Sequence, residues 1–597
     1  MPSYTAPLRE YRFLLKDVLD LERYSNLPTF SDAPMDLIDS VLEEGAKFCE
    51  GVLAPLNKVG DEHGCRRADD GSVTTPPGFK EAYKQLVDAG WPALSSDPNY
   101  GGQGMPHVVS LAWNEMVSSS NMAFGMYPGL SHGAYAAIHH HGSDEQKQTY
   151  LPKLVTGEWT GTMNLTEPHC GTDLGMLRTK AIPQADGSYR ITGQKIFISA
   201  GEHDLASNII HLVIARIEGA PAGTKGISLF IVPKFILDKD GNPGQRNGVV
   251  CGKIEEKMGI HGNSTCVLNY DDATGYLVGL ENKGLAAMFT MMNVARLGVG
   301  LQGLSQSEVA YQNGVLYAKD RLQGRSITGA KNPNGPADPI IVHPDIRRML
   351  MDAKAFNEGA RAFTFWTAIY GDLLEVSPDE KVREKAEDYM GLMTPVLKSY
   401  LTDKGYANAT NCQQIFGGHG YIEEHGMSQF VRDARIAMIY EGANGIQGLD
   451  LVGRKLGANG GRAIFAFFNE LDDFVHNYED DADLKEFVEA VKGAKAQLQD
   501  GTMWLMQNGM TNFDNAGAAS HDYLNLFGLT ALAYMWALQA KAALAAKKNG
   551  GAGDPYFDTK LTTGRYFIQR MLPDASAHLA KLKSGAGPVM ALAADAF

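Results

Sequence analysis

The sequence predicts an α+β protein in which a helical segment, a β segment, a second helical segment and a helical extension follow one another. Apolar residues recur at a spacing of three and four over most of the chain, as on the buried face of a helix. Between residues 159 and 284 the pattern changes to short β-branched and aromatic runs separated by glycines. Because 597 residues exceed the usual size of a single hydrophobic core, we expect several domains.

The first predicted domain comprises residues 1–158 and is helical. Leu37, Val41, Phe48 and Val52 are expected on one buried face of its first long helix. Clusters of Gly and Pro at residues 75–78 and 99–104 separate this helix from those that follow.

The second predicted domain comprises residues 159–284. Residues 189–193, 209–215 and 227–233 are short runs rich in Ile, Val and aromatic side chains, with glycine-containing turns between them. This pattern predicts an antiparallel β-sheet.

The remaining two predicted domains are helical and comprise residues 285–457 and 458–597. In the third domain, Met349, Ala353, Phe356 and Phe363 keep the helical spacing. The extension is rich in Ala and Leu and contains 12 Lys or Arg against 16 Asp or Glu, with no chemical motif. Its apolar stripe, formed by Phe465, Phe468, Leu471 and Phe474, is too large to remain in water, so we expect the extension to dock on the rest of the protein.

Composition narrows the range of partners and compartments. The net charge of −15 argues against nucleic acid or an anionic membrane as the main partner. The six cysteines form no CxxC pair and no metal-ligand spacing, which favours reduced thiols and no metal site. The first residues lack a secretory signal pattern and no run of 18 apolar residues occurs, so we expect a soluble cytoplasmic protein.

The tripeptide Tyr440-Glu441-Gly442 lies at a break between two helical patterns. The glycines at 442 and 445 should end the first helix and present Glu441 from a loop. A carboxylate is costly to bury without a partner, so the position of Glu441 matters, although an exposed loop glutamate would explain the tripeptide by itself.

A second cluster surrounds the segment from Leu165 to Asp173, where Pro168 and Gly171 force an irregular loop. The hydroxyls of Thr166 and Thr172 and the loop amides suit the polar edge of a ring system or a phosphate. In alternating strand geometry, Phe197 and Ser199 would face the same side and stack on a planar cofactor. An ordinary β-turn and a core phenylalanine would explain the same residues.

Two further clusters suit a phosphate-bearing ligand. The glycines after Gln414-Ile415-Phe416, at Gly417 and Gly418, permit a close approach of backbone to ligand. Arg321 lies where a helix is expected to end and suits a pyrophosphate, although a surface charge cluster would look the same.

These four clusters, in this order around Glu441, resemble the acyl-CoA dehydrogenase family, and the resemblance covers about residues 30–455. The total length and the helical extension resemble the longer branch of that family. Within this branch the chain most resembles members that convert 3-methylmercaptopropionyl-CoA to methylthioacryloyl-CoA in bacterial dimethylsulfoniopropionate demethylation. The resemblance implies an FAD-dependent α,β-dehydrogenation of an acyl-CoA to a trans-2-enoyl-CoA. It also implies electron-transfer flavoprotein as the electron acceptor, and a homodimer or a dimer of dimers.

The resemblance also assigns roles to individual residues. Glu441 would be the base that removes the α-proton, with its own backbone N–H and a flavin ribityl hydroxyl stabilising the thioester oxygen. The residues expected to bind FAD are Leu165, Thr166, Gly171, Thr172, Phe197, Ser199, Arg321, Gln414, Ile415, Phe416, Gly417 and Gly418, the last six of them across a subunit boundary. The residues expected to bind the acyl-CoA are Asn293, Arg296, Tyr440 and Gly442.

The chain departs from the family pattern at several positions. Phe197 replaces a frequent Trp, His169-Cys170 replaces Gly-Ala, and Ala443 and Gly445 replace Thr and Gln. Where some members carry the base on the preceding long helix this chain has Ala295, which leaves Glu441 as the only candidate.

Three alternative functions remain open at this point. They are a generic short- or medium-chain acyl-CoA dehydrogenase, an acyl-CoA oxidase, and a flavin-bearing DNA-associated relative without dehydrogenase activity. The last would need a basic face, which the acidic extension does not supply.

Overall fold

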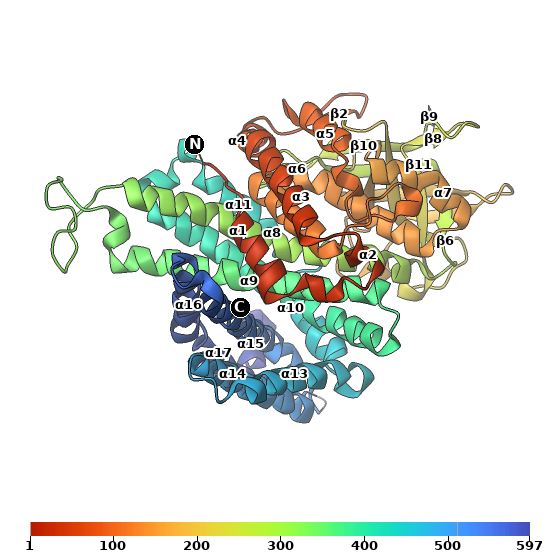
Figure 1. Ribbon diagram of the computed structural model, residues 1–597. Coiled ribbons are helices and arrows are strands. Elements are labelled where there is room, and N and C mark those ends of the chain that lie inside the picture. The colour runs from red at the N-terminus through yellow and green to blue at the C-terminus, as the bar shows by residue number, and fades with distance from the viewer. Residues whose placement is uncertain (1, 510) are drawn as a thin grey trace. The chain divides into compact units, whose positions relative to one another are not determined.

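The computed structural model describes residues 2–509 and 511–597 (Figure 1). Its contacts divide the chain into two compact units. Unit 1 comprises residues 1–46, 106–115 and 299–597, and unit 2 comprises residues 47–105 and 116–298. These units join segments that are distant in sequence, so they do not follow the four consecutive segments predicted above. That division stays a prediction about domains.

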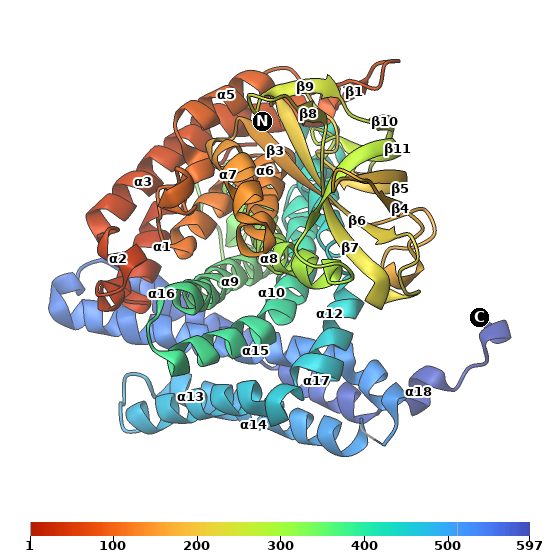
Figure 2. The ribbon, with the colours of Figure 1, turned by 90° about the vertical axis from the view of Figure 1, so that its right-hand side faces the viewer.

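Unit 2 is built on a seven-stranded sheet (Figure 2). Its strands are β3 (Trp159–Asn164), β4 (Lys180–Pro183), β5 (Tyr189–Ser199), β6 (Asn208–Ile217), β7 (Ile227–Pro233), β10 (Val249–Ile254) and β11 (Thr265–Val278). The order is β10-β11-β5-β4-β6-β3, with β7 paired to both β11 and β6. Two small ribbons accompany it, β1 (Arg66–Arg67) with β2 (Val73–Thr74) and β8 (Phe235–Leu237) with β9 (Pro243–Arg246).

The sheet is mixed, so the prediction of an antiparallel sheet is wrong in part. The three predicted runs form β5, β6 and β7 as expected, and β6 pairs antiparallel with β7. However, β3 and β4 both pair parallel with β6. The continuous apolar run of β6 is typical of a central strand covered on both faces, which composition alone does not assign to either pairing direction.

Alternate residues of β6 supply two hydrophobic cores, one on each face of the sheet. Ile210, Leu212 and Ile214 lie in the core that includes Trp159 and residues of α6 (His107–His141) and α7 (Asp144–Thr156). Val213 and Ala215 lie in the other core, with the strand residues Ile191, Phe230 and Val232. The other helices assigned to unit 2 are α4 (Ala54–His63), α5 (Phe79–Asp88) and the part of α8 (Gly284–Asp320) up to residue 298.

The helix α3 (Met35–Phe48) forms where it is predicted but buries a different face. Ile38 and Leu42 are buried, whereas Leu37 is 42% exposed. Because one residue turns a helix by about 100°, the buried face lies one residue beyond the predicted one.

Unit 1 is helical. Its long helices are the C-terminal half of α8 (Gly284–Asp320), α9 (Pro344–Val376) and α10 (Glu380–Ile415), and the shorter ones are α1 (Leu8–Arg12), α2 (Pro28–Ser31), α11 (Met427–Ile436) and α12 (Asn444–Asp450). The predicted stripe of α9 is confirmed, since Met349, Ala353, Phe356 and Phe363 are all buried.

Among the described residues, α8 is the one helix that length and composition would allow to cross a membrane. Its apolar residues Met288, Met291, Leu301 and Leu304 are completely buried within the protein. Of the apolar window that meets this criterion, 44% is buried, so core packing accounts for part of the apolar composition of α8.

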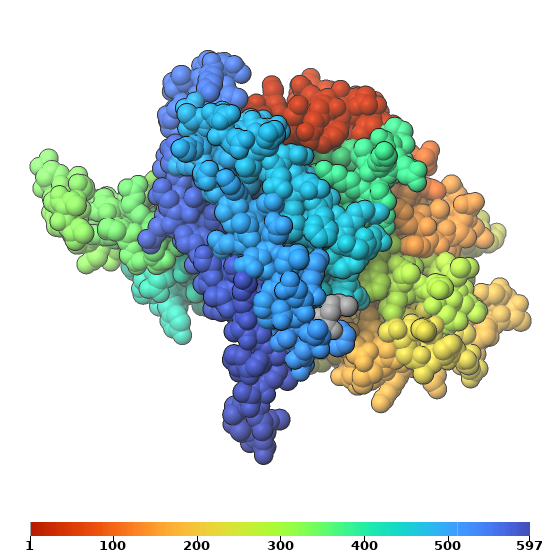
Figure 3. All heavy atoms as spheres, turned by 90° about the horizontal axis from the view of Figure 1, so that it is seen from below, coloured from red at the N-terminus to blue at the C-terminus, as the bar shows by residue number. Residues whose placement is uncertain are grey.

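The extension consists of α13 (Arg462–Tyr478), α14 (Lys485–Asn508), α15 (Phe513–Ala546), α16 (Pro555–Tyr566), α17 (Asp574–Lys583) and α18 (Gly587–Met590). These helices belong to unit 1, and α15 packs on α9 and α10 (Figure 2). The indole of Trp536 is buried and donates a hydrogen bond to the carbonyl of Ala355 on α9 (3.1 Å). Figure 3 shows the residues of the extension gathered on the face in view, with the last residues projecting from it.

The extension therefore docks on the helical body, as predicted. Phe468, Leu471 and Phe474 are buried, but Phe465 is 43% exposed. Phe467, which was not expected in the stripe, is completely buried instead and stacks on Phe527 of α15 at 5.4 Å. The buried stripe of α13 is thus shifted at its first residue.

The close approach of α15 to α10 depends on Gly528. A Cβ atom at this position would lie 2.4 Å from the ring of Tyr400, which is too close for any carbon contact. We therefore expect Gly528→Ala to lower the free energy of unfolding by about 1–3 kcal/mol, the usual effect of overpacking a core. The matched control on the same helix is Gly517→Ala, because nothing lies within 4 Å of that position. The control should raise stability by about 0.5–1 kcal/mol, as alanine does in a helix. Equal urea midpoints for the two variants would contradict this account.

A buried ionic cluster joins the N-terminal segment of unit 1 to α9 and α16. The ammonium of Lys560 donates to Glu10, to Glu358 (2.8 Å) and to the amide oxygen of Gln539 (3.2 Å). Tyr556 also donates to Glu10 (2.8 Å). This cluster, called here the Lys560 clasp, lines a cavity of about 340 Å³.

Candidate active site

Glu441 lies in a sharp turn of unit 1 between α11, which ends at Ile436, and α12, which begins at Asn444. The backbone of Glu441 is left-handed (φ 56°), and Gly442 continues with φ 84°. A left-handed glutamate is uncommon and strained, and such residues cluster at functional sites. The predicted helix break is confirmed, and the side chain of Glu441 is half-buried.

The backbone carbonyls of Glu441 and Gly442 both accept hydrogen bonds from side chains. The amide of Gln447 donates to the carbonyls of Glu441 (3.3 Å) and Gly442 (3.0 Å). The ammonium of Lys398, from α10, donates to the carbonyl of Gly442 (2.9 Å). The turn is therefore anchored on both of its peptide groups after Glu441.

Tyr440 is anchored before the turn. Its hydroxyl donates a hydrogen bond to the side-chain oxygen of Gln302 on α8. Burial raises the pKa of Tyr440 well above its usual value, and the negative charge of Glu441 raises it further. Tyr440 is therefore a neutral hydrogen-bond donor beside the carboxylate.

In unit 2, the loop after β3 is fixed to β5 by a buried ion pair. Lys195 donates to the carboxylate of Glu167 (2.9 Å) and to the carbonyl of Leu165 (2.9 Å). The amide of Ile196 donates to the carbonyl of Thr166 (2.9 Å). The two sequence clusters predicted to bind FAD are thus brought together here.

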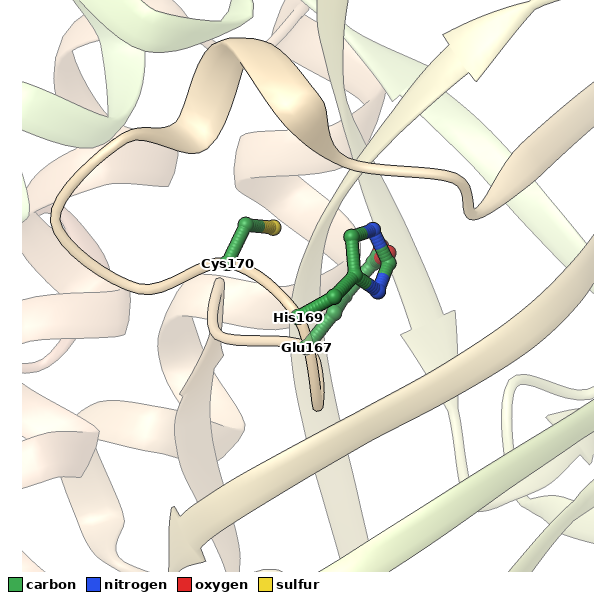
Figure 4. A group of neighbouring side chains, drawn as sticks. All are labelled: Glu167, His169 and Cys170. Atoms are coloured by element: carbon green, nitrogen blue, oxygen red, sulfur yellow. The ribbon is translucent and has the colours of Figure 1, made fainter.

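The carboxylate of Glu167 also neighbours His169 and Cys170, and the polar atoms of the three side chains lie within 4.8 Å of one another (Figure 4). One oxygen of Glu167 accepts from the amide and the hydroxyl of Thr179 and from Lys195, and the other accepts from the amide of Arg178. Although burial acts to raise the pKa of Glu167, the Lys195 charge and these donors hold it below its usual value. Because His169 also hydrogen-bonds to a backbone carbonyl (3.0 Å), we attribute this group to anchoring of the loop rather than to a metal.

The residues of this loop that are expected to contact the cofactor differ in exposure. Gly171 and Thr172 are exposed and Thr166 is half-buried, whereas Leu165 is buried. A Cβ atom at Gly171 would meet no atom closer than 3.5 Å, so the space above the loop is open. The arrangement fits the edge of a ring system.

Phe197 does not follow the alternating geometry that was assumed for it. The pairing of β5 with β11 shifts between Ile198 and Lys195, where β5 contains one extra residue. Phe197 lies in this bulge with a left-handed backbone (φ 60°) and a side chain that is 60% exposed, while Ser199 is half-buried. A bulge re-aims a side chain, and an exposed aromatic ring held in this way is suited to stacking on a planar ligand.

In unit 1, the Arg321 segment and residues 414–418 lie side by side, although nearly 100 residues separate them in sequence. Tyr317, in the last turn of α8, stacks on Phe416 with ring centroids 4.1 Å apart, and its hydroxyl lies 2.8 Å from the ring nitrogen of His419. Arg321, Gln414, Gly417 and Gly418 are exposed, while Ile415 and Phe416 are buried beneath them.

The residues expected to bind acyl-CoA are divided between the units. Tyr440 and Gly442 flank Glu441 in unit 1. Asn293 and Arg296 lie on the part of α8 that belongs to unit 2, where Asn293 is exposed and Arg296 is half-buried.

Sequence reasoning missed the residues that hold these loops. Lys195 and Glu167 lie inside the motifs, but nothing in their spacing indicated that they pair. Lys398 is a single lysine within a helical pattern, and no motif marks it. It stands out in the structure because it is a lysine at a buried position of α10.

Four family models match consecutive parts of the chain. They are the acyl-CoA dehydrogenase N-terminal domain (residues 40–158), middle domain (162–273) and C-terminal domain (282–456), and a model described as acetyl-CoA dehydrogenase C-terminal like (467–593). Together they account for the catalytic body and for the extension.

Known proteins match over nearly the whole chain. The chain is 41% identical to 3-methylmercaptopropionyl-CoA dehydrogenase of Ruegeria pomeroyi, covering 97% of this chain and 98% of that protein. It is 35% identical to a butyryl-CoA dehydrogenase of Syntrophomonas wolfei, with 97% of each chain covered. An acyl-CoA dehydrogenase from Bacillus anthracis, solved in complex with FAD, has the same fold (TM-score 0.75, 22% identity, 96% of this chain and 91% of that chain).

The identity to these relatives and its extent identify the family, and the motifs that carry the resemblance occupy the turns and loops described above. The chain belongs to the acyl-CoA dehydrogenase family.

Proposed function

We propose that this protein is an FAD-dependent dehydrogenase that introduces a trans double bond between the α- and β-carbons of an acyl-CoA thioester. The observation that carries the proposal is the strained turn that presents Glu441, in a chain whose relatives are acyl-CoA dehydrogenases. The proposed substrate is 3-methylmercaptopropionyl-CoA, because the 41% identical relative is named for this thioester. Butyryl-CoA is the second candidate, because a 35% identical relative is named for it.

Glu441 is the proposed general base. The α-proton of a thioester is weakly acidic, so its removal requires a carboxylate held close to the α-carbon and a donor for the developing charge on the thioester oxygen. In this proposal the Glu441 carboxylate takes the proton and the Glu441 backbone N–H is one of the donors. Asn293, Arg296, Tyr440 and Gly442 are proposed to contact the acyl-CoA.

FAD is the proposed cofactor, and when bound it accepts the β-hydride. The residues present fit this group, since exposed Thr172, half-buried Thr166 and the exposed ring of Phe197 border an open surface beside the anchored loop. Leu165, Gly171 and Ser199 complete the proposed flavin site. Arg321 and Gln414-Ile415-Phe416-Gly417-Gly418 are proposed to reach the FAD of a partner subunit, which makes the active assembly a homodimer or a dimer of dimers.

Electron-transfer flavoprotein is the proposed electron acceptor, and the proposed compartment is the cytoplasm. Neither nucleic acid nor a membrane is a proposed partner, in keeping with the net charge of −15.

Arg321→Ala tests the proposed pyrophosphate contact. Because an arginine pairs strongly with phosphate oxygens, the variant is expected to lose FAD. Its dimer should also dissociate into monomers at a higher protein concentration than the dimer of the parent protein. Flavin absorbance per chain and sedimentation velocity measure the two effects. Arg570→Ala, which removes another exposed cation from unit 1, is the control. If Arg321→Ala remains fully flavinated and dimeric, the arginine is only a surface charge.

A substrate panel under anaerobic conditions tests the proposed reaction. The holoenzyme is mixed with 3-methylmercaptopropionyl-CoA, butyryl-CoA and octanoyl-CoA in turn, and dye reduction and the enoyl-CoA product are measured. We expect the highest kcat/KM with 3-methylmercaptopropionyl-CoA. A higher value with butyryl-CoA would favour the generic dehydrogenase, and stoichiometric peroxide release in air would favour an oxidase. No reduction of the bound flavin by any of the thioesters would refute the proposed function.

A further inference from the structure

Lys398 is a buried cation directed at the turn that carries Glu441. It lies in the middle of α10 and is completely inaccessible to solvent. Its ammonium donates to the carbonyl of Gly442 (2.9 Å) and to the side-chain oxygen of Asn444 (2.8 Å). Burying an ammonium is costly, so a lysine at such a position needs strong acceptors, and both of these acceptors belong to the turn.

Asn444 connects this lysine to the rest of α10. Its amide nitrogen donates to the carboxylate of Asp403 (2.7 Å) and to the hydroxyl of Thr402 (2.9 Å). Burial raises the pKa of Asp403, while the Asn444 hydrogen bond and the charges of His521 and Lys398 act to lower it. The first residue of α12 is therefore held by three side chains of a single helix.

The turn needs such support because Glu441 has a left-handed backbone that a non-glycine residue adopts only when its surroundings impose it. Gln447 holds the carbonyls of Glu441 and Gly442 from one side, and it belongs to the same turn and helix as they do. Lys398 holds the Gly442 carbonyl from a different helix, so it alone of these two ties the turn to the body of unit 1.

We propose that Lys398 is a positioning residue, which together with Asn444 fixes the Gly442 peptide and thereby holds Glu441 in place for removal of the substrate α-proton. The inference rests on the proposed function, in which Glu441 is the base. It deepens that proposal by assigning the geometry of the base to a charge on α10.

The test uses the full-length holoenzyme with Lys398→Met, which removes the ammonium and keeps an apolar chain of similar length. We expect kcat to fall about 10- to 100-fold, since a small misplacement of a reacting group has effects of that size. KM should change less than threefold and the flavin spectrum should be retained. Lys381→Met is the matched control, because Lys381 lies in the exposed first turn of the same helix and should leave kcat unchanged.

The primary kinetic isotope effect with α-deuterated 3-methylmercaptopropionyl-CoA, or with whichever thioester the panel selects, separates positioning from a merely structural role. Partial unfolding would lower kcat by reducing the number of active molecules and would leave the isotope effect unchanged. Slower proton abstraction should instead raise the isotope effect. Unchanged kcat and isotope effect in Lys398→Met would overturn the proposal.

Asn444→Ala keeps the proposal testable if Lys398→Met does not fold. This variant should lower kcat and raise the isotope effect in the same way. Where both variants fold, their effects on kcat should be clearly less than multiplicative in the double variant, because they remove parts of one device. Fully multiplicative effects would overturn the coupling of Lys398 and Asn444.

Glu441→Gln, assayed in parallel, distinguishes failure of this inference from failure of the proposed function. If Glu441→Gln retains turnover, Glu441 is not the base and both fail. If Glu441→Gln is inactive while Lys398→Met and Asn444→Ala behave like the parent enzyme, only the inference about Lys398 fails.

Discussion

Glu441→Gln is expected to lower turnover by about 10²–10⁴-fold while FAD remains bound, the usual size of a general-base contribution. The amide keeps the shape of the side chain and its half-buried position but cannot take a proton. The hydrogen bonds from Gln447 and Lys398 reach backbone carbonyls, so the turn should survive the change.

The measurement is anaerobic reduction of the bound flavin by the acyl-CoA in a stopped-flow instrument. Thermal unfolding and flavin absorbance show whether the variant is folded and loaded. Glu424→Gln provides a matched control, because this glutamate is exposed and lies outside the turn. Turnover within a few-fold of the parent enzyme in Glu441→Gln would remove Glu441 from the mechanism.

Lys560→Met is expected to have the largest effect on stability, about 3–5 kcal/mol, because it removes a buried cation that two buried carboxylates share. Lys560 is 2% exposed, and its partners Glu10 and Glu358 are also buried. Removing the ammonium leaves Glu10 with the hydroxyl of Tyr556 and Glu358 with Lys354. Urea unfolding followed by tryptophan fluorescence is suited to the measurement, since Trp536 lies beside the clasp with its ring 5.7 Å from the ammonium.

Lys548→Met is the control for this variant, because Lys548 forms an exposed ion pair with Asp483 and should contribute little to stability.

The free energy of unfolding that is lost in Lys560→Met should also depend on pH. Burial acts to raise the pKa of Glu358, but the charges of Lys560 and Lys354 lower it to about 2. Because this pKa lies below that of an unfolded glutamate, the stabilisation is complete above about pH 4.5 and is lost as the pH falls toward 2. A difference between Lys560→Met and its parent that stays constant over this range would contradict the assignment.

The order of secondary structure could be predicted because its signals are local. The runs at β5, β6 and β7 and the stripe of α9 follow directly from periodicity. The parallel pairing of β3 with β6 could not be predicted, since a central strand has the same composition in either pairing direction. The buried face of α3 differs by one residue because the apolar neighbours Leu37-Ile38 and Val41-Leu42 form two overlapping stripes on this helix.

The residues of the candidate site that belong to a sequence motif could be predicted. The residues that hold the loops in place from elsewhere in the fold were missed. Glu441 is marked by its neighbours in the chain, and the helix break around it is a local property. Neither Lys398 nor the pairing of Lys195 with Glu167 is marked in this way. A buried lysine is recognised only by the residues that surround it in the fold. The bulge at Phe197 depends on a register between two strands about 70 residues apart, which no window of sequence contains.

The Lys560 clasp joins Glu10 to a residue 550 positions later in the chain, so it can form only near the end of synthesis. At about 5–20 residues per second, a ribosome needs roughly half a minute to two minutes to pass from one partner to the other. During that time Phe13, which ends up 3% exposed and packed against Tyr556 and Phe557 of α16, lacks these two partners. Unit 2, whose segments end at residue 298, can be completed while unit 1 still waits for its last helices. We therefore expect the side chain of Phe13 to lack its α16 partners until translation is nearly over, and the nascent chain to need protection from aggregation at this point.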